Sequence, residues 1–555
     1  MTNIKRIFFF SVFLILFPVF LGSECSGRND VYIRTNQVGF LPKDIKTAVI
    51  LSEENLKGSD IQVISSIQNK VVFKSRLKKS QGKFGNFNFT YYFDFSPLQT
   101  EGVYKIRIDG LDSYSFRIGN DIYNSIAGKL LSFFRMQRCG YTNPLDHEVC
   151  HKSDATSMIE NGVVKNQSID VTGGWHDAAD YIKFLNTTAY STYTLLFAYE
   201  FDSQKFGFDD DKNGVPDIIE EAKIGLDWLL RANIDDRKLV TQVQDLSDHD
   251  VGWRLPENDP LENDRPAFVG IGKNLIGIYT ATLALASRVW KEKYDYNNFS
   301  EKCLRTAENF YSLRNQVTDI DTNGTNHYRD GDYRGKMALA AVEMYITTNN
   351  KSYYDEAVQY ADDAGSDYWW SWGDINSFAH YRLTAFDKRF IKYLENNLTN
   401  FSDNSTKNLF NEGVALRWGS NNTMLGVALQ NILYKKLTGK NTFKKLEIEH
   451  RDYILGRNQW GISFISQVGY DYPRHFHHQV SYLKKINLPG GFAAGPVSKS
   501  YLDSQKIEYE NNDRFVKFQT EDACYRDDRM DYITNEPTIS ANATAIFVMG
   551  FYSKG

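Results

Sequence analysis

The sequence predicts a mainly α-helical protein, in which a small β-sandwich at residues 30–118 precedes a large helical domain at residues 120–555. Three observations lead to this prediction. The chain has 555 residues, which is more than one hydrophobic core usually serves. Its first part alternates apolar and polar side chains at period two, whereas the remainder has apolar side chains at helical spacing. With 42% apolar and 24% charged residues, the composition is that of a folded protein.

Residues 1–25 fit a secretory signal peptide. Two basic residues precede an apolar run over residues 7–21. That run is shorter than the roughly twenty residues that a membrane span needs. We therefore expect a secreted protein, extracellular or periplasmic, with no membrane span. Lipid attachment at Cys25 is the alternative, although Glu24 directly before it fits such a site poorly.

The predicted β-sandwich contains several short stretches that are rich in Val, Ile, Phe and Tyr. Residues 103–108, Val-Tyr-Lys-Ile-Arg-Ile, alternate as a strand with one buried face does. Turn residues at 82–85 and 109–110 separate such stretches. Several short strands in about 90 residues favour a small sandwich.

From residue 123 onward, apolar side chains recur every three to four residues. The stretches that show this spacing are 218–230, 275–289, 337–344, 353–364, 423–437 and 443–455. We expect roughly a dozen helices without interleaved strands, hence an all-α domain. Loops at one face of such a domain would carry the chemistry.

Charge and composition narrow the possible partners. A net charge of -5 gives no electrostatic reason to expect nucleic acid or an anionic membrane. Aromatic residues make up 14%, and they serve either large cores or flat surfaces for sugars. Six tryptophans are open to both interpretations: Trp253, Trp369, Trp370, Trp372, Trp418 and Trp460. Five cysteines are too few and odd in number for a disulfide framework.

Two acidic segments are candidates for catalysis. Asp177 and Asp180 follow a double glycine, so one turn can point both carboxylates into one cavity, where their repulsion separates their pKa values. Helix capping is the alternative. Glu536 is the only acid in the stretch 532–542, where partial desolvation would raise its pKa as a general acid requires. An ordinary glutamate at a helix start is the alternative there.

A histidine-rich segment, Tyr-Pro-Arg-His-Phe-His-His at residues 472–478, suggests metal ligation or polar contacts to a neutral substrate. Together the three segments resemble glycoside hydrolase family 9, the inverting cellulases with an (α/α)6 barrel. The aspartate segment differs from the family pattern at Ala179, where glycine is usual. Residues 455–479 and 531–543 are similar to the family's histidine and acid motifs, and residues 35–42 look like the start of its immunoglobulin-like domain.

The resemblance implies a role for each carboxylate. Asp180 would be the general base, Asp177 would help to position the water, and Glu536 would be the general acid. An inverting enzyme needs carboxyls about 6.5–9.5 Å apart, so two distant segments must meet. The implied activity is endo-hydrolysis of β-1,4-glucan in cellulose, mixed-linkage glucan or xyloglucan. The alternatives are an exo-acting β-glucosidase or glucosaminidase, a xyloglucan-specific relative and a non-catalytic glycan-binding protein.

The implied substrate contacts depart from the family at one place. Four side chains would contact the glucan: Arg474, His477, His478 and Tyr532. The family's arginine after the histidine pair is Gln479 here, and its proline after Arg-Asn is Gln459. The arginine ordinarily holds glucan hydroxyls or orients a carboxylate, so the preferred glucan stays open. We expect a monomer that acts on β-glucan polysaccharide.

Two metal sites are predicted, both structural. Two thiols and two imidazoles would form a closed tetrahedral zinc site, similar to one in family members with the immunoglobulin-like domain: Cys139, Cys150, His151 and His176. Free thiols with unrelated histidines, or a disulfide, are the alternatives. Residues 209–220 fit the twelve-residue calcium loop with glycine at position six. Its ligands would be Asp209, Asp211, Asn213, Asp217 and Glu220. A solvated acidic helix start is the alternative.

Overall fold

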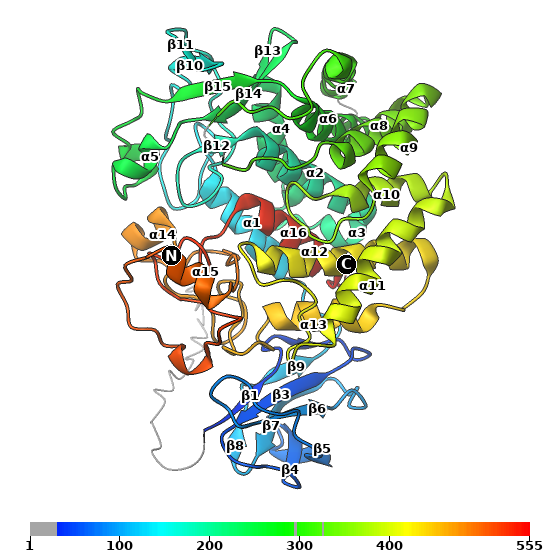
Figure 1. Cartoon of the computed structure of the whole chain (residues 1–555), viewed down its shortest axis with the longest axis vertical. Coiled ribbons are helices and arrows are strands. Elements are labelled where there is room, and N and C mark those ends of the chain that lie inside the picture. The colour runs from blue at the N-terminus through cyan, green and yellow to red at the C-terminus, as the bar shows by residue number, and fades with distance from the viewer. Residues whose placement is uncertain (1–29, 294–296, 325–326, 555) are drawn as a thin grey trace, which may run out of the picture.

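The computed structural model describes residues 30–293, 297–324 and 327–554. The predicted signal peptide, with Cys25, lies outside the described residues. A β-rich domain (blue in Figure 1) adjoins a larger helical domain that holds the C-terminus. Among the described helices, none is both long and apolar enough to cross a membrane.

The N-terminal domain is a sandwich of two sheets. One sheet has the order β1-β3-β6, and the other has the order β2-β9-β7-β4-β5 with β8 paired to β7. The strands are β1 (Val31–Arg34), β2 (Gly39–Phe40), β3 (Thr47–Ser52), β4 (Asp60–Ser65), β5 (Lys70–Arg76), β6 (Phe89–Asp94), β7 (Gly102–Ile108), β8 (Leu111–Asp112) and β9 (Phe116–Ile118). Along β7, Tyr104, Ile106 and Ile108 are buried whereas Lys105 and Arg107 are not, as the alternation predicts.

The helical domain is a double ring. Six inner helices contact one another in chain order, and the last returns to the first: α2 (Leu185–Phe201), α6 (Lys273–Lys293), α8 (Arg334–Thr348), α10 (Asn376–Thr384), α12 (Ser420–Thr438) and α16 (Ile539–Phe551). Each inner helix has an outer partner, namely α4 (Asp217–Arg231), α7 (Asn297–Ser312), α9 (Lys351–Ala364), α11 (Ile391–Ser405), α13 (Lys444–Ile454) and α1 (Ile126–Gln137) in the same order. The predicted (α/α)6 barrel is confirmed.

Some inner helices are buried on every side. In α2 every residue from Leu185 to Tyr199 is buried, although several are polar. Hydroxyls there donate to backbone carbonyls one turn earlier, as Thr192 Oγ1 does to the Thr188 oxygen at 2.7 Å. A helix that is buried all round has no polar face. Apolar spacing indicated α4, α6, α8, α9, α12 and α13 but not α1, α2, α7, α10, α11 or α16, although α12 is buried all round as well.

The expectation of a domain without strands was wrong. Six short strands form a sheet at the top of the barrel in Figure 1, with the order β11-β10-β15-β14-β12 and β13 on β14. They are β10 (Ser157–Glu160), β11 (Val163–Lys165), β12 (Lys183–Phe184), β13 (Asn233–Ile234), β14 (Lys238–Val243) and β15 (Pro266–Gly270). Strands of two to six residues are too short to show a clear period.

Short helices complete the connections between these elements. They are α3 (Ser203–Phe206), α5 (Ser247–Asp250), α14 (Gln479–Lys484) and α15 (Lys499–Ser504). The 3-10 turns are η1 (Pro256–Asn258), η2 (Leu313–Asn315), η3 (Lys388–Phe390) and η4 (Val516–Phe518).

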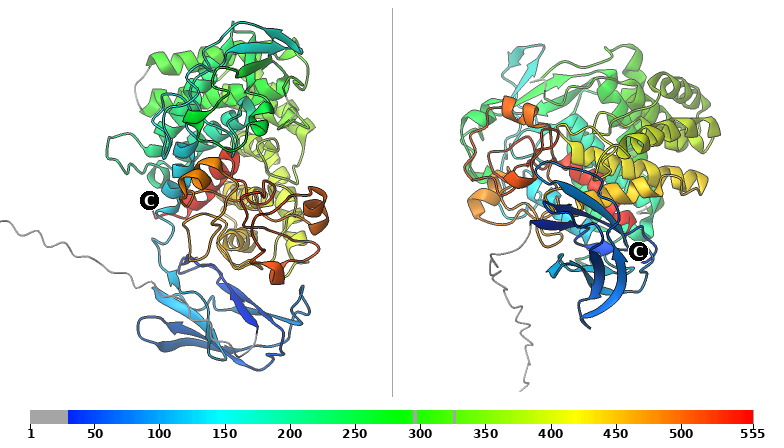
Figure 2. Two further views of the ribbon diagram at one scale, coloured as in Figure 1. Left: turned by 90° about the vertical axis from the view of Figure 1, so that its left-hand side faces the viewer. Right: turned by 60° about the horizontal axis from the view of Figure 1, so that its bottom comes forward.

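The sandwich is joined to the barrel by buried polar contacts. Asn36 Nδ2 donates to Asp452 Oδ1 at 2.8 Å, and Arg451 pairs with Asp44 at 2.9 Å. The Gln37 amide oxygen accepts from the backbone N–H groups of Tyr470 and Asp471. Figure 2 shows the sandwich beneath the long connection between α13 and α16, which carries residues 455–538. The sandwich therefore supports the connection that bears the histidine segment.

Candidate active site and metal clusters

A cleft of about 800 Å³ lies at the N-terminal ends of the inner helices. All six connections that precede these helices contribute to its lining. Its ionisable and aromatic side chains include Asp180, Asp248, His249, Trp253, His327, Tyr328, Trp369, Trp370, Trp372, Trp418, His477, Tyr532 and Glu536. Loops at one end of a helical barrel thus supply the chemical groups, as we expected.

The aspartate turn precedes α2 and holds two carboxylates. Asp177 is buried and accepts from the Thr187 hydroxyl in the first turn of α2. Asp180 is partly exposed to the cleft, and its Oδ1 accepts from the Ile182 N–H at 3.1 Å. Neither aspartate caps α2, because that helix begins at Leu185 and Phe184 is its N-cap residue. The capping alternative is therefore excluded for this pair.

Glu536 reaches the same turn from the other end of the chain. Its Oε1 accepts from the Ala179 N–H at 3.2 Å, between the two aspartates in sequence. The Ile539 N–H, at the start of α16, donates to the Asp177 carbonyl at 3.0 Å and fixes the two segments together. Asp180 and Glu536 therefore line one cleft, and Asp177 is buried behind it in the same turn.

The surroundings of these carboxyls favour the protonated form of Glu536. Burial raises the pKa of Glu536 well above its ordinary value, and the negative charge of Asp180 raises it further. Burial also raises the pKa of Asp177 to about 7, against the hydrogen bond from Thr187. Desolvation of this kind keeps a carboxylic acid neutral near neutral pH.

Two groups next to the carboxyls were not predicted from the sequence. On α5, His249 Nε2 lies 3.2 Å from Asp180 Oδ2, and this hydrogen bond raises the pKa of His249. Burial and the charges of Asp177 and Glu536 raise the pKa of the Tyr328 phenol well above its ordinary value, so that it stays a proton donor. Neither residue belongs to a recognisable sequence motif. Only the fold brings their connections to the aspartate turn.

Of the predicted substrate contacts, the structure places His477 and Tyr532 in the cleft lining. The ring Nδ1 of His477 donates to the Arg529 carbonyl at 2.6 Å, and burial lowers the pKa of His477 to about 4. The other two lie elsewhere. His478 is buried, with Nε2 at 2.7 Å from the Gln137 side-chain oxygen. Arg474 is exposed on the Tyr472 ring, outside the cleft lining.

Gln479 and Gln459, which stand where the family usually has arginine and proline, make contacts in different parts of the structure. Gln479 lines the cleft, where its Nε2 donates to the Ala179 carbonyl at 3.2 Å and its Oε1 accepts from the Arg254 N–H at 2.8 Å. Gln459 is buried away from the cleft lining and donates to the carbonyls of Phe518 and Ala523. Gln479 therefore holds the aspartate turn, whereas Gln459 joins two loops.

A row of aromatic rings follows one wall of the cleft. Neighbouring ring centroids are 5.3 Å apart between Tyr482 and Trp253, and 5.2 Å apart between Trp253 and His477. The row continues from His477 to Tyr532 at 6.0 Å and from Tyr532 to Trp418 at 6.1 Å. The cleft lining contains five of the six ambiguous tryptophans, namely Trp253, Trp369, Trp370, Trp372 and Trp418. Trp460 instead packs in the core.

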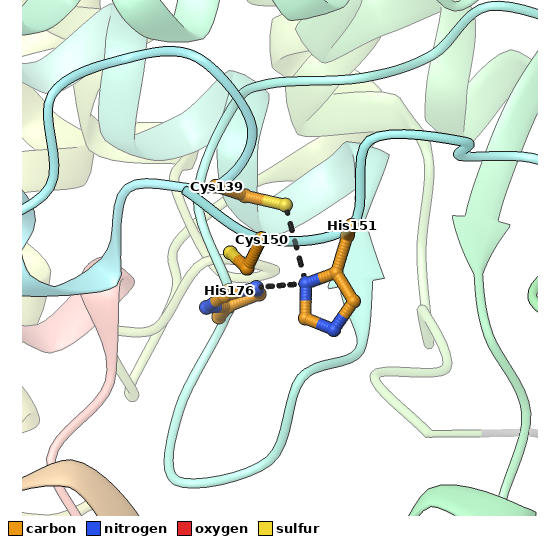
Figure 3. Close-up of side chains that lie close together, drawn as sticks. All are labelled: Cys139, Cys150, His151 and His176. Atoms are coloured by element: carbon orange, nitrogen blue, oxygen red, sulfur yellow. Dashed lines mark hydrogen bonds between the residues drawn. The ribbon is translucent and has the colours of Figure 1, made fainter. Parts of the chain in front are cut away.

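The predicted zinc ligands meet in the interior (Figure 3). One ligand atom of each lies within 4.8 Å of the others, and all four residues are buried: Cys139, Cys150, His151 and His176. His151 Nδ1 lies 3.0 Å from His176 Nε2 and 3.6 Å from Cys139 Sγ. Its other nitrogen donates to Asp259 at 3.0 Å, which leaves the Nδ1 lone pair free for a metal. Both thiols are free, so the cluster could hold a metal ion.

The predicted calcium loop also gathers its acids. Carboxylate oxygens of Asp209, Asp211 and Asp217 lie within 4.8 Å of one another. The Asn213 side chain donates to Glu220 at 2.7 Å, so it faces the same loop. Burial, reinforced by neighbouring acids, raises the pKa of Asp217 to about 6. This cluster could also hold a cation, although it is more exposed than the Cys–His cluster.

Comparisons with known proteins agree with this architecture. The family model for glycosyl hydrolase family 9 matches residues 123–549, and that for the cellulase N-terminal ig-like domain matches residues 29–113. A xyloglucan-specific endo-β-1,4-glucanase of Bacteroides ovatus is 24% identical over 575 residues, which cover 93% of this chain and 92% of that protein. A cellodextrinase of Butyrivibrio fibrisolvens is 25% identical over 563 residues, covering 93% and 98%.

Solved structures show the same fold. The crystal structure of a metagenome-derived glycoside hydrolase family 9 endoglucanase aligns with a TM-score of 0.81 at 23% identity. The alignment covers 95% of this chain and 99% of that structure.

Proposed function

Because the chain belongs to glycosyl hydrolase family 9 and is a glycoside hydrolase, we propose that it is an inverting endo-β-1,4-glucanase. The observation that carries the proposal is the hydrogen bond from the Ala179 N–H to Glu536, which brings the acid to the turn of Asp177 and Asp180. Inversion needs an acid and a base on opposite sides of one sugar ring. The cleft offers both at one place.

Glu536 is the proposed general acid. Burial raises its pKa well above the ordinary value, so that it keeps its proton at neutral pH, and it lines the cleft where a glycosidic oxygen would lie. As the bond between the anomeric carbon and that oxygen breaks, the proton moves from Glu536 to the leaving sugar. The protonated carboxyl thus prevents a charged leaving group.

Asp180 is the proposed general base. It removes a proton from the water that attacks the anomeric carbon on the face opposite the leaving oxygen. His249 and the Ile182 N–H each contact one of its oxygens, which fixes the carboxylate plane. Asp177, held by Thr187, would accept the second hydrogen of that water. Burial and the charges of both aspartates raise the pKa of Tyr328, and we assign this residue to the same hydrogen-bond network.

The aromatic row supports endo rather than exo action. His477, in the middle of the row, lines the same cleft as Asp180, the proposed base. Its two ends, Tyr482 and Trp418, are 44% and 47% exposed. A glucan chain could therefore extend past the catalytic centre in both directions, as internal cleavage requires. An exo-acting enzyme would instead need one end to be closed.

The charge of the lining supports a neutral substrate. The lining residues that the structure describes include Asp180, Asp248 and Glu536 but neither Lys nor Arg. With no Lys or Arg among the described lining residues to pair with a uronate, and with His249 already paired with Asp180, an acidic glycan would be repelled. Cellulose, mixed-linkage glucan and xyloglucan are all neutral, and we propose this class as substrate.

Hydrolysis of a panel of β-glucans tests the proposal. Wild type is expected to release oligosaccharides from the interior of a soluble β-1,4-glucan and to give an α-configured product first, which NMR detects. Retention of the β configuration would contradict inversion. Release of only glucose or cellobiose from chain ends would favour the exo-acting alternative. Binding without any hydrolysis would indicate a glycan-binding protein.

We also propose that the two metal clusters hold structural ions. The chemistry of the Cys–His cluster, two thiols and two imidazoles, suits zinc, and the oxygen donors of loop 209–220 suit calcium. Zinc would hold His176, and through it the neighbouring catalytic turn. Metal analysis of the purified protein tests both assignments. One zinc that is lost on mutation of Cys139, and one calcium lost on mutation of Asp209, are expected.

The signal-like residues 1–25 support secretion, and we propose a monomer that acts outside the cytoplasm. Expression of the full chain tests the first point, because processing would shorten the N-terminus by about 25 residues. Size-exclusion chromatography with light scattering tests the second.

A further inference from the structure

Tyr482 is a large aromatic side chain that is both exposed and firmly held. It lies on α14, and 44% of it is exposed. Its ring meets the Trp253 ring edge to face, with centroids 5.3 Å apart and an interplanar angle of 83°. Trp253 lines the cleft, whereas Tyr482 does not. Tyr482 thus stands next to the cleft, just outside it.

The Arg529 side chain contacts both rings, Tyr482 and Trp253. The Arg529 guanidinium lies 4.1 Å from the Tyr482 centroid and 4.7 Å from that of Trp253. Arg529 is itself paired with Glu510, to which its Nε donates at 2.6 Å. The guanidinium therefore lies against the Tyr482 ring, yet 44% of this residue stays exposed. The charge of Arg529 is already neutralised by Glu510, so an anionic ligand gains little here.

The platform is also fixed relative to the catalytic centre. The helix that carries Tyr482 begins at Gln479, whose amide donates to the Ala179 carbonyl in the catalytic turn. The Arg529 carbonyl accepts from His477 Nδ1 at 2.6 Å, in the middle of the aromatic row. A rigid aromatic surface loses little conformational entropy on binding, which is the condition for useful stacking.

We propose that Tyr482 forms an outer sugar subsite, which stacks against one neutral glucosyl unit of a β-1,4-linked chain that extends beyond Trp253. The apolar C–H face of a pyranose suits an uncharged ring of this kind. The inference rests on the proposed function for the identity of the chain. The proposed subsite would make binding stronger for longer chains. The carboxylates alone would carry out the chemical step.

The test compares cello-oligosaccharides of two to six units. Tyr482→Ala is expected to lower kcat/KM about tenfold for the longest oligosaccharide, with a loss that grows with chain length. Tyr482→Phe should keep most of the wild-type value, because the ring and not the hydroxyl stacks. Phe386→Ala is the matched control. Phe386 is 48% exposed just after the C-terminal end of α10, at the opposite end of the barrel from the cleft.

Binding to an inactive protein separates this inference from the proposed function. In Glu536→Gln, calorimetry should show that affinity rises with oligosaccharide length, and that Tyr482→Ala removes the last increment. A loss that is equal at every length would overturn the subsite and would indicate a distorted α14. If wild type hydrolyses no β-1,4-glucan, the proposed function fails, and unchanged binding by the Tyr482 variant would reject the subsite as well.

Discussion

The proposed acid and the proposed base of the cleft differ in how they are supported. Among the described residues Glu536 accepts one hydrogen bond, from the Ala179 N–H, and burial raises its pKa well above the ordinary value. Asp180 has the Ile182 N–H on one oxygen and the His249 ring on the other. Glu536 is buried and has a hydrogen bond on one oxygen only, whereas Asp180 has one on each oxygen. The difference shows how two similar groups, a few ångströms from one backbone turn, can take opposite roles in proton transfer.

Removal of the acid and of the base gives the largest expected effects. Glu536→Gln and Asp180→Asn should each lower kcat on a soluble β-glucan by about 10²–10⁴-fold, which is the usual contribution of a general acid or base. An aryl β-cellobioside with an acidic phenol as leaving group separates the two roles, because its departure needs no proton. The Glu536 variant should recover much of its rate on that substrate, whereas the Asp180 variant should not. Equal recovery by both variants would mean that the assignment of roles is wrong.

The turn that carries the proposed base also adjoins the Cys–His cluster. His176 of the Cys–His cluster directly precedes Asp177, and the Cys139 N–H donates to the Gly174 carbonyl in the same turn. Cys139→Ser should therefore destabilise the protein on the order of 3 kcal/mol and reduce zinc content to near zero. Thermal unfolding and metal analysis measure both effects.

Asp211→Asn is the matched variant in the proposed calcium loop. Because Asp211 is exposed, whereas all four residues of the Cys–His cluster are buried, we expect a smaller loss of stability and unchanged zinc content. A larger loss of stability from Asp211→Asn than from Cys139→Ser would contradict the expectation that the Cys–His cluster matters more for folding.

The burial of Glu536 predicts that the free energy of unfolding depends on pH. Its pKa is higher in the folded state than in the unfolded chain, where it is about 4.3. The stability that Glu536 contributes is therefore fully present below the unfolded pKa and is lost as pH rises through the folded pKa. Glu536→Gln cannot ionise, so its melting temperature should match that of wild type near pH 4 and exceed it increasingly at higher pH. A constant difference across pH would show that the carboxyl is not desolvated.

The sequence was sufficient where function resides in short segments and insufficient where folding assembles it. The aspartate turn and the calcium loop each lie within about a dozen residues, so their spacing is visible in the chain. His249 and Tyr328 come from connections before α6 and α8, and nothing near them in sequence marks them. The missed strands are short pieces of the connections before α2 and α6. Burial on all sides leaves α2 and α16 without a polar face against which an apolar stripe would stand out.

Gln479 is linked through Ala179 to both the proposed acid and the proposed base. We expect its removal to lower kcat less than removal of either carboxylate does. Its amide holds the Ala179 carbonyl, while the Ala179 N–H contacts Glu536 and the next residue is Asp180. Loss of one such hydrogen bond is worth about 1 kcal/mol, so Gln479→Ala should lower kcat by about five- to tenfold with little change in KM. Gln459→Ala is the matched control, because Gln459 holds only the carbonyls of Phe518 and Ala523. It should lower the melting temperature and leave kcat as it is. If Gln479→Ala kept the wild-type kcat, the turn would be held by its other contacts, and the two sides of the cleft would be independent of this residue.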